Sequence, residues 1–391
     1  LFFTMANGSH ARHVVLPERR LEGHRSGGVN SWKDIVDHRK VFPAAHDERM
    51  VYAQIDFVGG FTAAAGCLVQ SGGAWPSEFA GNHFVCEPTV NLVHRDSLSP
   101  QGVTFNASKP RQAEFLASRD LWFRPVHLRT GPDGAMYVLD FYNQAAVHND
   151  TRGPDHGPTN AAVRPDRDKL HGRIWRVQHK NAPANRALLP QDTAGLIASL
   201  GHPGSWQRRT AERLLREEAG RGTTLPLWES LRESDSAAVR MRCLSLIHDL
   251  DGDPDKAVAA VAWALQDRDP AVSRRAAFLA GPLMAKSKAA RSMTAPLLHL
   301  AINTEDARTR MAALLALEHG ELQLAGLSQL LALAPKITED WTRSGLMAAL
   351  LSNPPVSLRA LLDAEESPAL DALVADLGQQ IGARRDGPLT N

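Results

Sequence analysis

The second half of this 391-residue chain repeats itself, and that repeat limits the fold more than any other feature of the sequence. Helix starts recur at intervals of about 33–35 residues, at Trp206, Val239, Val272, Ala307 and Trp341. Recurring helix pairs of this length are typical of α-solenoids, in which each pair buries its apolar face against its neighbours. The repeat therefore predicts an α-solenoid over residues 191–385, followed by a short tail over 386–391.

Arginines recur at one register of this repeat. They are Arg209, Arg242, Arg275 and Arg310, and acidic turns precede most of the helix starts. Carboxylates suit these turns because the free N–H groups and the dipole of a helix N-terminus favour negative charge. Two interpretations are open: an ion-pair ladder between adjacent repeats, or a basic groove that binds a ligand. We also expect the concave face of the solenoid to bind a protein partner.

Residues 1–180 follow a different pattern, in which short β-branched and aromatic runs alternate with Gly, Pro, Asn and Asp. The runs lie at 12–16, 50–58, 66–70, 83–88, 91–98, 126–131, 135–141 and 173–178. Strands at this spacing indicate a sandwich, a barrel or a propeller. A tight turn is expected at 132–134 (Pro-Asp-Gly), since proline presets φ and glycine accepts a positive φ. Residues 181–190 are expected to form a linker.

Composition excludes some functions for this chain. The formal net charge is +1, so no overall field favours a nucleic-acid partner. No apolar run approaches the roughly 18–20 residues that span a bilayer. Of the three cysteines, Cys243 fits a buried helix position, whereas Cys67 and Cys86 fall on neighbouring predicted strands. These two form either a disulfide, which would indicate an oxidising compartment, or two buried thiols.

Four stretches carry a resemblance to a known group of proteins. They are NGSHARHVVLP (7–17), FAGNHFVCEPTVNLVHRDSL (79–98), EFLASRDLWFRPVHLRTGPDGAMYVLDFYNQAAVHND (114–150) and HGRIWRVQHK (171–180). Through them the chain resembles the large membrane-bound dehydrogenases of planctomycetes and related bacteria. Those proteins combine a glucose/sorbosone-dehydrogenase-like β-propeller, HEAT-like repeats and often a cytochrome c domain.

The resemblance implies a β + α multidomain fragment: a partial β-propeller made of C-terminal blades over residues 1–180, followed by HEAT-like repeats. It also implies a periplasmic or cell-envelope parent protein that oxidises a sugar or similar alcohol with a quinone or haem cofactor. The alternative is a non-catalytic propeller and HEAT scaffold that binds carbohydrate or protein. Propellers host both kinds of function, so the fold does not decide between them.

One site residue follows from the resemblance to the last blade of soluble quinoprotein glucose dehydrogenases. There Arg124 matches an arginine that contacts the carboxylates of pyrroloquinoline quinone. A guanidinium fork suits a planar carboxylate because it binds both oxygens at once. The alternative is a structural arginine that stacks on Trp122 or Phe123 and pairs with Asp120 or Asp140.

The sequence also departs from that family. Thr89 stands where those enzymes offer a lysine to the cofactor, and the C-x-x-C-H segment that would carry haem c does not occur in the chain. The blades that would supply the catalytic base and much of the calcium site are expected upstream of Leu1. The catalytic residues therefore remain unassigned, and we expect the fragment alone to be inactive.

Two polar segments supply further cofactor-binding candidates. His10 and His13 lie in a polar loop, where a histidine pair at i and i+3 suits a metal, a quinone or general-base chemistry, or else an ordinary surface turn. Glu87 is expected at the mouth of the propeller channel, whereas His94 is expected to pack within its blade.

The last group of candidates follows the strand at 135–141. Asp140, His148 and Asp150 lead into a Gly- and Pro-rich loop over 151–172, whose oxygen-rich side chains suit Ca²⁺. A solvated lid closed by Arg–Asp pairs, or a disordered segment, are the alternatives.

Overall fold

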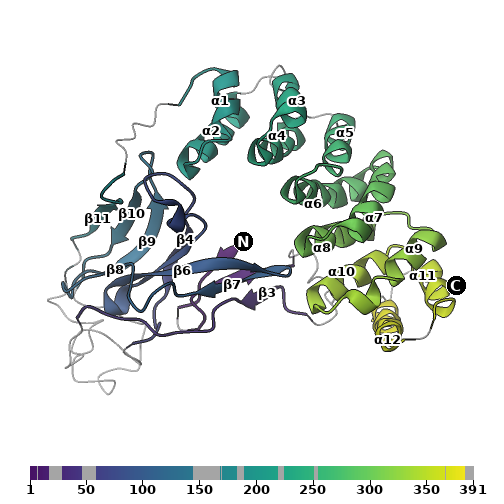
Figure 1. Ribbon diagram of the computed structural model, residues 1–391, viewed down its shortest axis with the longest axis horizontal. Helices are drawn as coiled ribbons and strands as arrows, with labels where there is room; N and C mark the ends of the chain where they lie inside the picture. The colour runs from purple at the N-terminus through teal and green to yellow at the C-terminus, as the bar shows by residue number, and fades with distance from the viewer. Residues whose placement is uncertain are drawn as a thin grey trace. The chain divides into compact units, whose positions relative to one another are not determined.

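The chain divides into two compact units. The computed structural model describes residues 1–6, 8–16, 29–45, 59–143, 168, 170–182, 189–218, 224–250, 254–365 and 367–383. The first unit comprises residues 1–14, 32–188 and 202–208, and the second comprises 15–31, 189–201 and 209–391. The first carries the β-strands and the second is helical (Figure 1).

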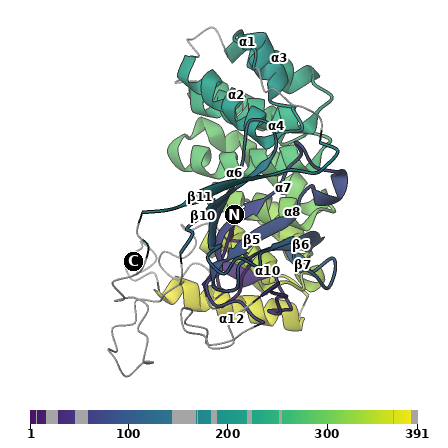
Figure 2. The same ribbon diagram turned by 90° about the vertical axis from the view of Figure 1, so that its left-hand side faces the viewer.

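Three antiparallel sheets make up the described part of the first unit. One has the order β1 (Phe2–Phe3), β2 (Arg12–Val14), β3 (Trp32–Asp34). The second has the order β4 (Ala65–Val69), β5 (His83–Glu87), β6 (Leu92–Gln101), β7 (Thr104–Ser108), with β8 (Leu116–Ala117) also beside β6. The third has the order β11 (Arg173–Val177), β10 (Met136–Asp140), β9 (Pro125–Thr130). Figure 2 shows β5, β6 and β7 side by side.

The sequence predicts most of these strands. Every predicted run except 50–58 contains a strand, and that run lies outside the described residues. The turn at 132–134 is confirmed, because Gly134 adopts φ +77°. Strands β1, β3, β7 and β8 are not among the predicted runs, since β1, β3 and β8 are only two or three residues long and β7 (TFNAS) carries just two apolar side chains.

The two faces of the β5–β6 pair bury different sets of side chains. Phe84, Cys86 and Val93 pack against the sheet that contains β9 and β10, together with Leu128 and Met136. Successive side chains of a strand point to opposite faces, so Val85 and Leu92 lie on the other side. There they form a small apolar cluster with Val41, Phe61, Ala64 and Val90. This second face carries the candidate site.

The cysteines are free thiols in the structure. Cys86 is buried on β5, and burial raises its pKa above the ordinary value for a thiol. Cys67 on β4 is partly buried, and its pKa is raised for the same reason. Of the two interpretations left open by the sequence, the structure has the unpaired thiols.

The second unit is a succession of helices that follow one another in chain order (Figure 1). The α-helices are α1 (Thr193–Ser199), α2 (Ser205–Glu218), α3 (Thr224–Glu233), α4 (Ala237–Leu250), α5 (Pro254–Ala264), α6 (Pro270–Lys286), α7 (Thr294–Asn303), α8 (Ala307–Ala316), α9 (Leu324–Leu331), α10 (Asp340–Leu350), α11 (Pro354–Leu362) and α12 (Pro368–Ala383). Within the described residues, none of these helices is both long enough and apolar enough to cross a bilayer.

The predicted helix starts are confirmed. Each anchor of the sequence repeat lies within the first three residues of α2, α4, α6, α8 or α10. Helix α6 packs between α4 and α8, and α8 in turn packs against α10. One continuous apolar core runs from Leu196 to Leu377, as stacking between repeats requires. Acidic N-caps also occur where expected, since Asp269 and Asp306 accept backbone N–H bonds at α6 and α8.

The repeated arginines make different contacts from one another. Arg242 forms an ion pair with Glu212 on α2 at 3.0 Å, as the ladder interpretation predicts. Arg275 donates to the Ser245 hydroxyl, and Arg310 donates to the backbone carbonyls of Ala301 and Thr304 at the end of α7. Other arginines form ion pairs with an acidic residue of the following segment. These ion pairs are Arg240–Asp267, Arg274–Asp306 and Arg343–Asp376. A ladder is therefore present, one or two residues away from the predicted register.

Candidate metal centre

Two of the central side chains come from one face of β6. His94 and Asp96 are two residues apart on this strand, so both point to the same side of the sheet. On β5, Val85 pairs with His94 and His83 pairs with Asp96 in the antiparallel register. His94 and Asp96 are fully buried. The expectation that His94 packs within its sheet is met, but its ring also has polar partners.

The other two side chains reach the same place from earlier in the chain. His10 precedes β2 and is fully buried, with its ring stacked on Phe61 at a centroid distance of 4.0 Å. His38 follows β3, and its side chain retains 19% exposure. Among these four residues, His38 is therefore the one in contact with solvent.

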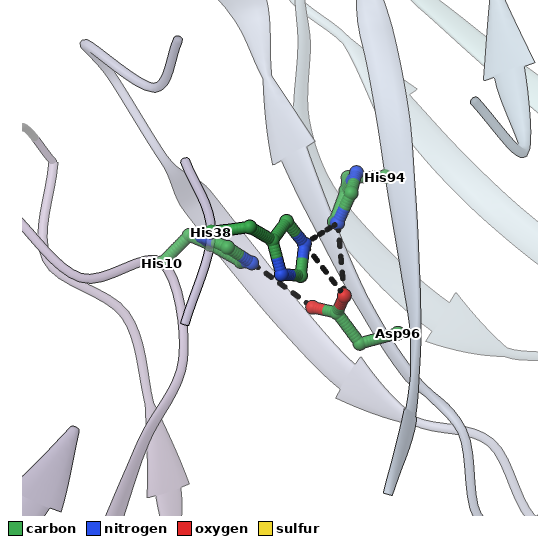
Figure 3. A group of neighbouring side chains, drawn as sticks. All are labelled: His10, His38, His94 and Asp96. Atoms are coloured by element: carbon green, nitrogen blue, oxygen red, sulfur yellow. Dashed lines mark hydrogen bonds and ion pairs between the residues drawn. The ribbon is translucent and has the colours of Figure 1, made fainter. Parts of the chain in front are cut away.

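These side chains converge on the Asp96 carboxylate (Figure 3). His10 Nε2 lies 2.9 Å from Oδ2, while His94 Nε2 and His38 Nε2 lie 3.0 Å and 3.2 Å from Oδ1. The Nε2 atoms of His38 and His94 are 3.4 Å apart. One ligand atom from each of the four residues lies within 4.8 Å of all the others. We refer to His10, His38, His94 and Asp96 as the His₃Asp cluster.

The electrostatics of the cluster centre on Asp96. Burial opposes its ionisation, but the hydrogen bonds from the three histidines outweigh burial and hold the pKa of this carboxyl far below its ordinary value. For His94, burial is likewise outweighed by Asp96 and Glu114, and its pKa is raised. Burial dominates at His10 and lowers its pKa to about 4. The hydrogen bond to Asp96 raises the pKa of His38.

A second layer of carboxylates orients two of the imidazoles. Glu114 Oε2 accepts from His94 Nδ1 at 2.7 Å, and Glu114 is itself held by Lys109 Nζ at 2.8 Å and the Phe42 N–H at 2.9 Å. Asp37 Oδ1 lies 3.0 Å from His38 Nδ1. Both carboxylates bind Nδ1, which leaves Nε2 directed at the centre. A histidine whose second nitrogen binds a carboxylate is the usual arrangement in metal sites.

The donor set fits a divalent transition metal. Three imidazole nitrogens and one carboxylate oxygen suit Zn²⁺, Fe²⁺ or a similar ion, whereas Ca²⁺ and Mg²⁺ prefer oxygen ligands throughout. Zn–N bonds of about 2.0–2.1 Å in a tetrahedron place neighbouring ligand atoms roughly 3.3 Å apart. The contacts of 2.9–3.4 Å within the His₃Asp cluster are close to this spacing, and the remaining ligand atoms lie within 4.8 Å of one another. The four side chains would need only small adjustments to bind an ion.

The predicted histidine pair is divided between two environments. His10 belongs to the His₃Asp cluster. His13 lies on β2, where its Nδ1 is 3.0 Å from the Thr104 hydroxyl and its ring contacts Phe2 and Phe105. The i, i+3 spacing therefore does not bring these two rings to one ligand.

Glu87 lies inside the first unit and orders a turn. Its carboxylate accepts the backbone N–H groups of Thr62, Ala63 and Thr89 at 2.9–3.1 Å. Burial raises its pKa, although these three hydrogen bonds act in the opposite direction. Glu87 is fully buried, so its contacts are those of a residue that fixes the connection between β5 and β6.

Arg124 approaches the same connection from the start of β9. Its guanidinium donates to the carbonyls of Pro88 and Thr89 at 2.9 Å and to that of Asn143 at 3.2 Å. Burial lowers its pKa to about 10. These contacts with backbone carbonyls give no support to a quinone at Arg124, and the cofactor role stays a prediction from the resemblance.

Replacing Arg124 by methionine is expected to destabilise the β-sheet unit by about 2–4 kcal/mol. The variant leaves up to three buried carbonyls without a donor, and each such loss costs roughly 1–3 kcal/mol. Removing the desolvation cost of the buried guanidinium offsets part of this sum. Thermal unfolding followed by tryptophan fluorescence measures the change. Arg129→Met on the exposed side of the same strand is the matched control and is expected to change stability by less than about 0.5 kcal/mol. Equal effects of the two substitutions would contradict this role.

Of the three residues predicted to bind calcium, the structure describes only Asp140. Asp140 is buried, and its two oxygens accept four hydrogen bonds, from Arg124 N, Tyr142 N, Arg173 Nε and Trp175 Nε1. Those contacts leave little room for a metal at Asp140. His148 and Asp150 lie outside the described residues, so the calcium site remains a prediction.

Sequence reasoning missed three members of this site. Asp96, His38 and Glu114 were not among the candidates, although Asp96 had a usable signal. Histidine and aspartate at alternate positions of one strand, as in His94-Arg95-Asp96, place two ligands on one face. His38 and Glu114 come from irregular segments with no comparable pattern.

Comparisons with known proteins add little to this geometry. The sequence model of one domain family, described as a domain of unknown function (DUF7133), matches residues 1–181. No curated protein matches the chain. Among solved structures, a designed armadillo repeat protein in complex with the peptide (KR)4 is 15% identical, covering 49% of this chain and 99% of its own, with a TM-score of 0.31. An engineered protein is also 15% identical, covering 51% of this chain and 100% of its own, with a TM-score of 0.33. At such TM-scores the likeness supports no conclusion about function.

Proposed function

We propose that the β-sheet unit is a metal-binding module that holds one divalent transition-metal ion, with Zn²⁺ as the best fit, in the His₃Asp cluster. The observation that carries the proposal is the convergence of three imidazole Nε2 atoms on one buried carboxylate. Ligands that lie 86 residues apart in the sequence, His10 and Asp96, meet at 2.9 Å.

The surroundings favour a metal over a hydrogen-bond network that only stabilises the sheet. In such a network either ring nitrogen of a histidine can face the carboxylate. Here His94 and His38 both present Nε2 to the centre because Glu114 and Asp37 bind their Nδ1 atoms. This selection of one nitrogen is what metal-bound histidines require. A bound Zn²⁺ would supply a Lewis acid there and would lower the pKa of a coordinated water to about 7.

The test is a metal titration of the full chain after treatment with a chelator. We expect one Zn²⁺ per chain by isothermal titration calorimetry, confirmed by elemental analysis after dialysis. His94→Ala is expected to abolish this binding, whereas His13→Gln, a nearby histidine outside the cluster, is expected to leave it unchanged. Absence of any ion bound at micromolar concentration, or equal loss in both variants, would rule out the proposal.

Glu114 should set the strength of that binding. Glu114→Gln is expected to weaken Zn²⁺ affinity by about 10–100-fold, as is usual when the carboxylate partner of a metal-bound histidine is lost. Asp37→Asn should have a smaller effect, within about 3-fold, because Asp37 is 75% exposed and water can replace it. Competition with a chromophoric chelator measures both constants. The reverse order of the two effects would be incompatible with this role of Glu114.

At the level of the fold we further propose that the sheets are propeller blades and that the helical unit is a HEAT-type solenoid. The antiparallel sheets joined in chain order support the first, and the 33–35-residue spacing of packed helices supports the second. A solenoid of this kind would act as a scaffold for a protein partner. Limited proteolysis would release the helical unit. A pulldown that compares the proteins retained by this unit with those retained by the whole chain would test that role.

A further inference from the structure

A fourth histidine, outside the His₃Asp cluster, lies beside Asp96. His83 on β5 is the register partner of Asp96, so the two side chains project from the same face of neighbouring strands. Its Nδ1 lies 4.0 Å from Asp96 Oδ2. His83 is fully buried, and within the described residues neither of its ring nitrogens has a hydrogen-bond partner.

Such an arrangement calls for a polar partner. A buried imidazole with two unpaired nitrogens is unfavourable, and each such group in a folded protein needs an explanation. The separation of 4.0 Å is too long for a direct hydrogen bond, but one small polar atom in contact with both groups would bridge it. His10 Nδ1, on the other side of Asp96, is likewise buried and without a partner among the described residues.

We infer that His83 binds a water molecule or small anion that occupies an additional coordination position of the metal in the His₃Asp cluster. The inference rests on the proposed function. Three histidines and Asp96 fill four positions, and a fifth ligand is known at catalytic zinc sites, which sometimes expand to five-coordination. His83 lies beside the oxygen of Asp96 that faces His10, whereas the partly exposed His38 lies on the other oxygen. Because His38 is the partly exposed member of the cluster, a small ligand would reach the ion past His38, and the position would be exchangeable rather than closed.

The experiment uses the full chain loaded with Co²⁺, whose visible absorption reports ligand changes, and titrates it with sodium azide. In the wild-type protein azide is expected to change the spectrum in a saturable way. His83→Phe keeps an aromatic ring but removes both nitrogens, and it is expected to weaken azide affinity about 10-fold or more. The affinity for Co²⁺ itself is expected to stay within about 3-fold. His127→Phe, the same substitution in the sheet that contains β9, is the matched control.

Each outcome has a separate meaning. If the wild-type protein binds Co²⁺ but its spectrum does not respond to azide, the exchangeable position does not exist, although the metal centre does. If His83→Phe alters the cobalt spectrum before azide is added and lowers Co²⁺ affinity about 100-fold, His83 is itself a ligand and the inference is wrong. Failure to bind Co²⁺ at all would instead remove the proposed function. His83→Asn, which is polar and smaller, covers the case in which the phenylalanine variant does not fold.

Discussion

Asp96→Ala is expected to lower the affinity of the chain for Zn²⁺ by at least about 1000-fold, well beyond the effect of losing a second-layer carboxylate. Asp96 supplies the one carboxylate ligand of the His₃Asp cluster, and the three histidines are all within 3.2 Å of it. Without it, three imidazoles would have to bind a divalent ion with no neutralising ligand. Calorimetric titration of the chelator-treated variant measures the loss.

A milder substitution separates charge from geometry at the same position. Asp96→Asn keeps an oxygen in place but removes the negative charge, so we expect an affinity between those of Asp96→Ala and the wild type. Circular dichroism should show the same strand content in both variants, which would exclude unfolding as the cause. Full Zn²⁺ affinity in Asp96→Ala would show that the ion binds elsewhere.

Asp267→Ala is expected to destabilise the helical unit by about 3–5 kcal/mol. Asp267 and Arg240 form a two-pronged ion pair at 2.7 Å and 2.8 Å, and their side chains are only 2% and 4% exposed. Removing one partner of a buried pair leaves the other charge without compensation, which is the costly case. Asp267 also accepts the backbone N–H of Asp269, so the turn before α6 is weakened as well.

An exposed pair nearby provides the control. Asp235 and Arg268 lie 3.3 Å apart in full contact with solvent, and Asp235→Ala should change stability by less than about 1 kcal/mol. The double substitution Arg240→Met with Asp267→Leu should recover much of the loss, because no unpaired charge remains. Denaturant unfolding followed by helical circular dichroism measures all three. Similar losses for Asp267→Ala and Asp235→Ala would contradict the importance of burial.

The secondary structure was predictable where local patterns decide it. The 33–35-residue repeat locates the starts of α2, α4, α6, α8 and α10, because each helix must present its apolar stripe to the next. Short runs of β-branched and aromatic residues between turn residues likewise locate β5, β6, β9 and β10. The strands β1, β3 and β8 were missed because two or three residues are too few to show a pattern, and β7 was missed because only two of its five side chains are apolar.

The site was much less predictable, and Arg124 shows why. Its position in an Arg-Pro pair favours a cofactor contact by resemblance, yet the guanidinium faces three backbone carbonyls of the folded chain. No sequence pattern reveals such carbonyls as partners. The sequence singles out His10, but its neighbours His38 and Asp96 become visible only when segments 28 and 86 residues away are brought together.

The pairing of β5 with β6 determines whether the cluster exists at all. If β6 slid by a single residue against its neighbours, His94 and Asp96 would turn toward the apolar side now filled by Phe84 and Val93, and Arg95 would take their place. An ion bound by these side chains would therefore stabilise the aligned register of the sheet relative to the misaligned one.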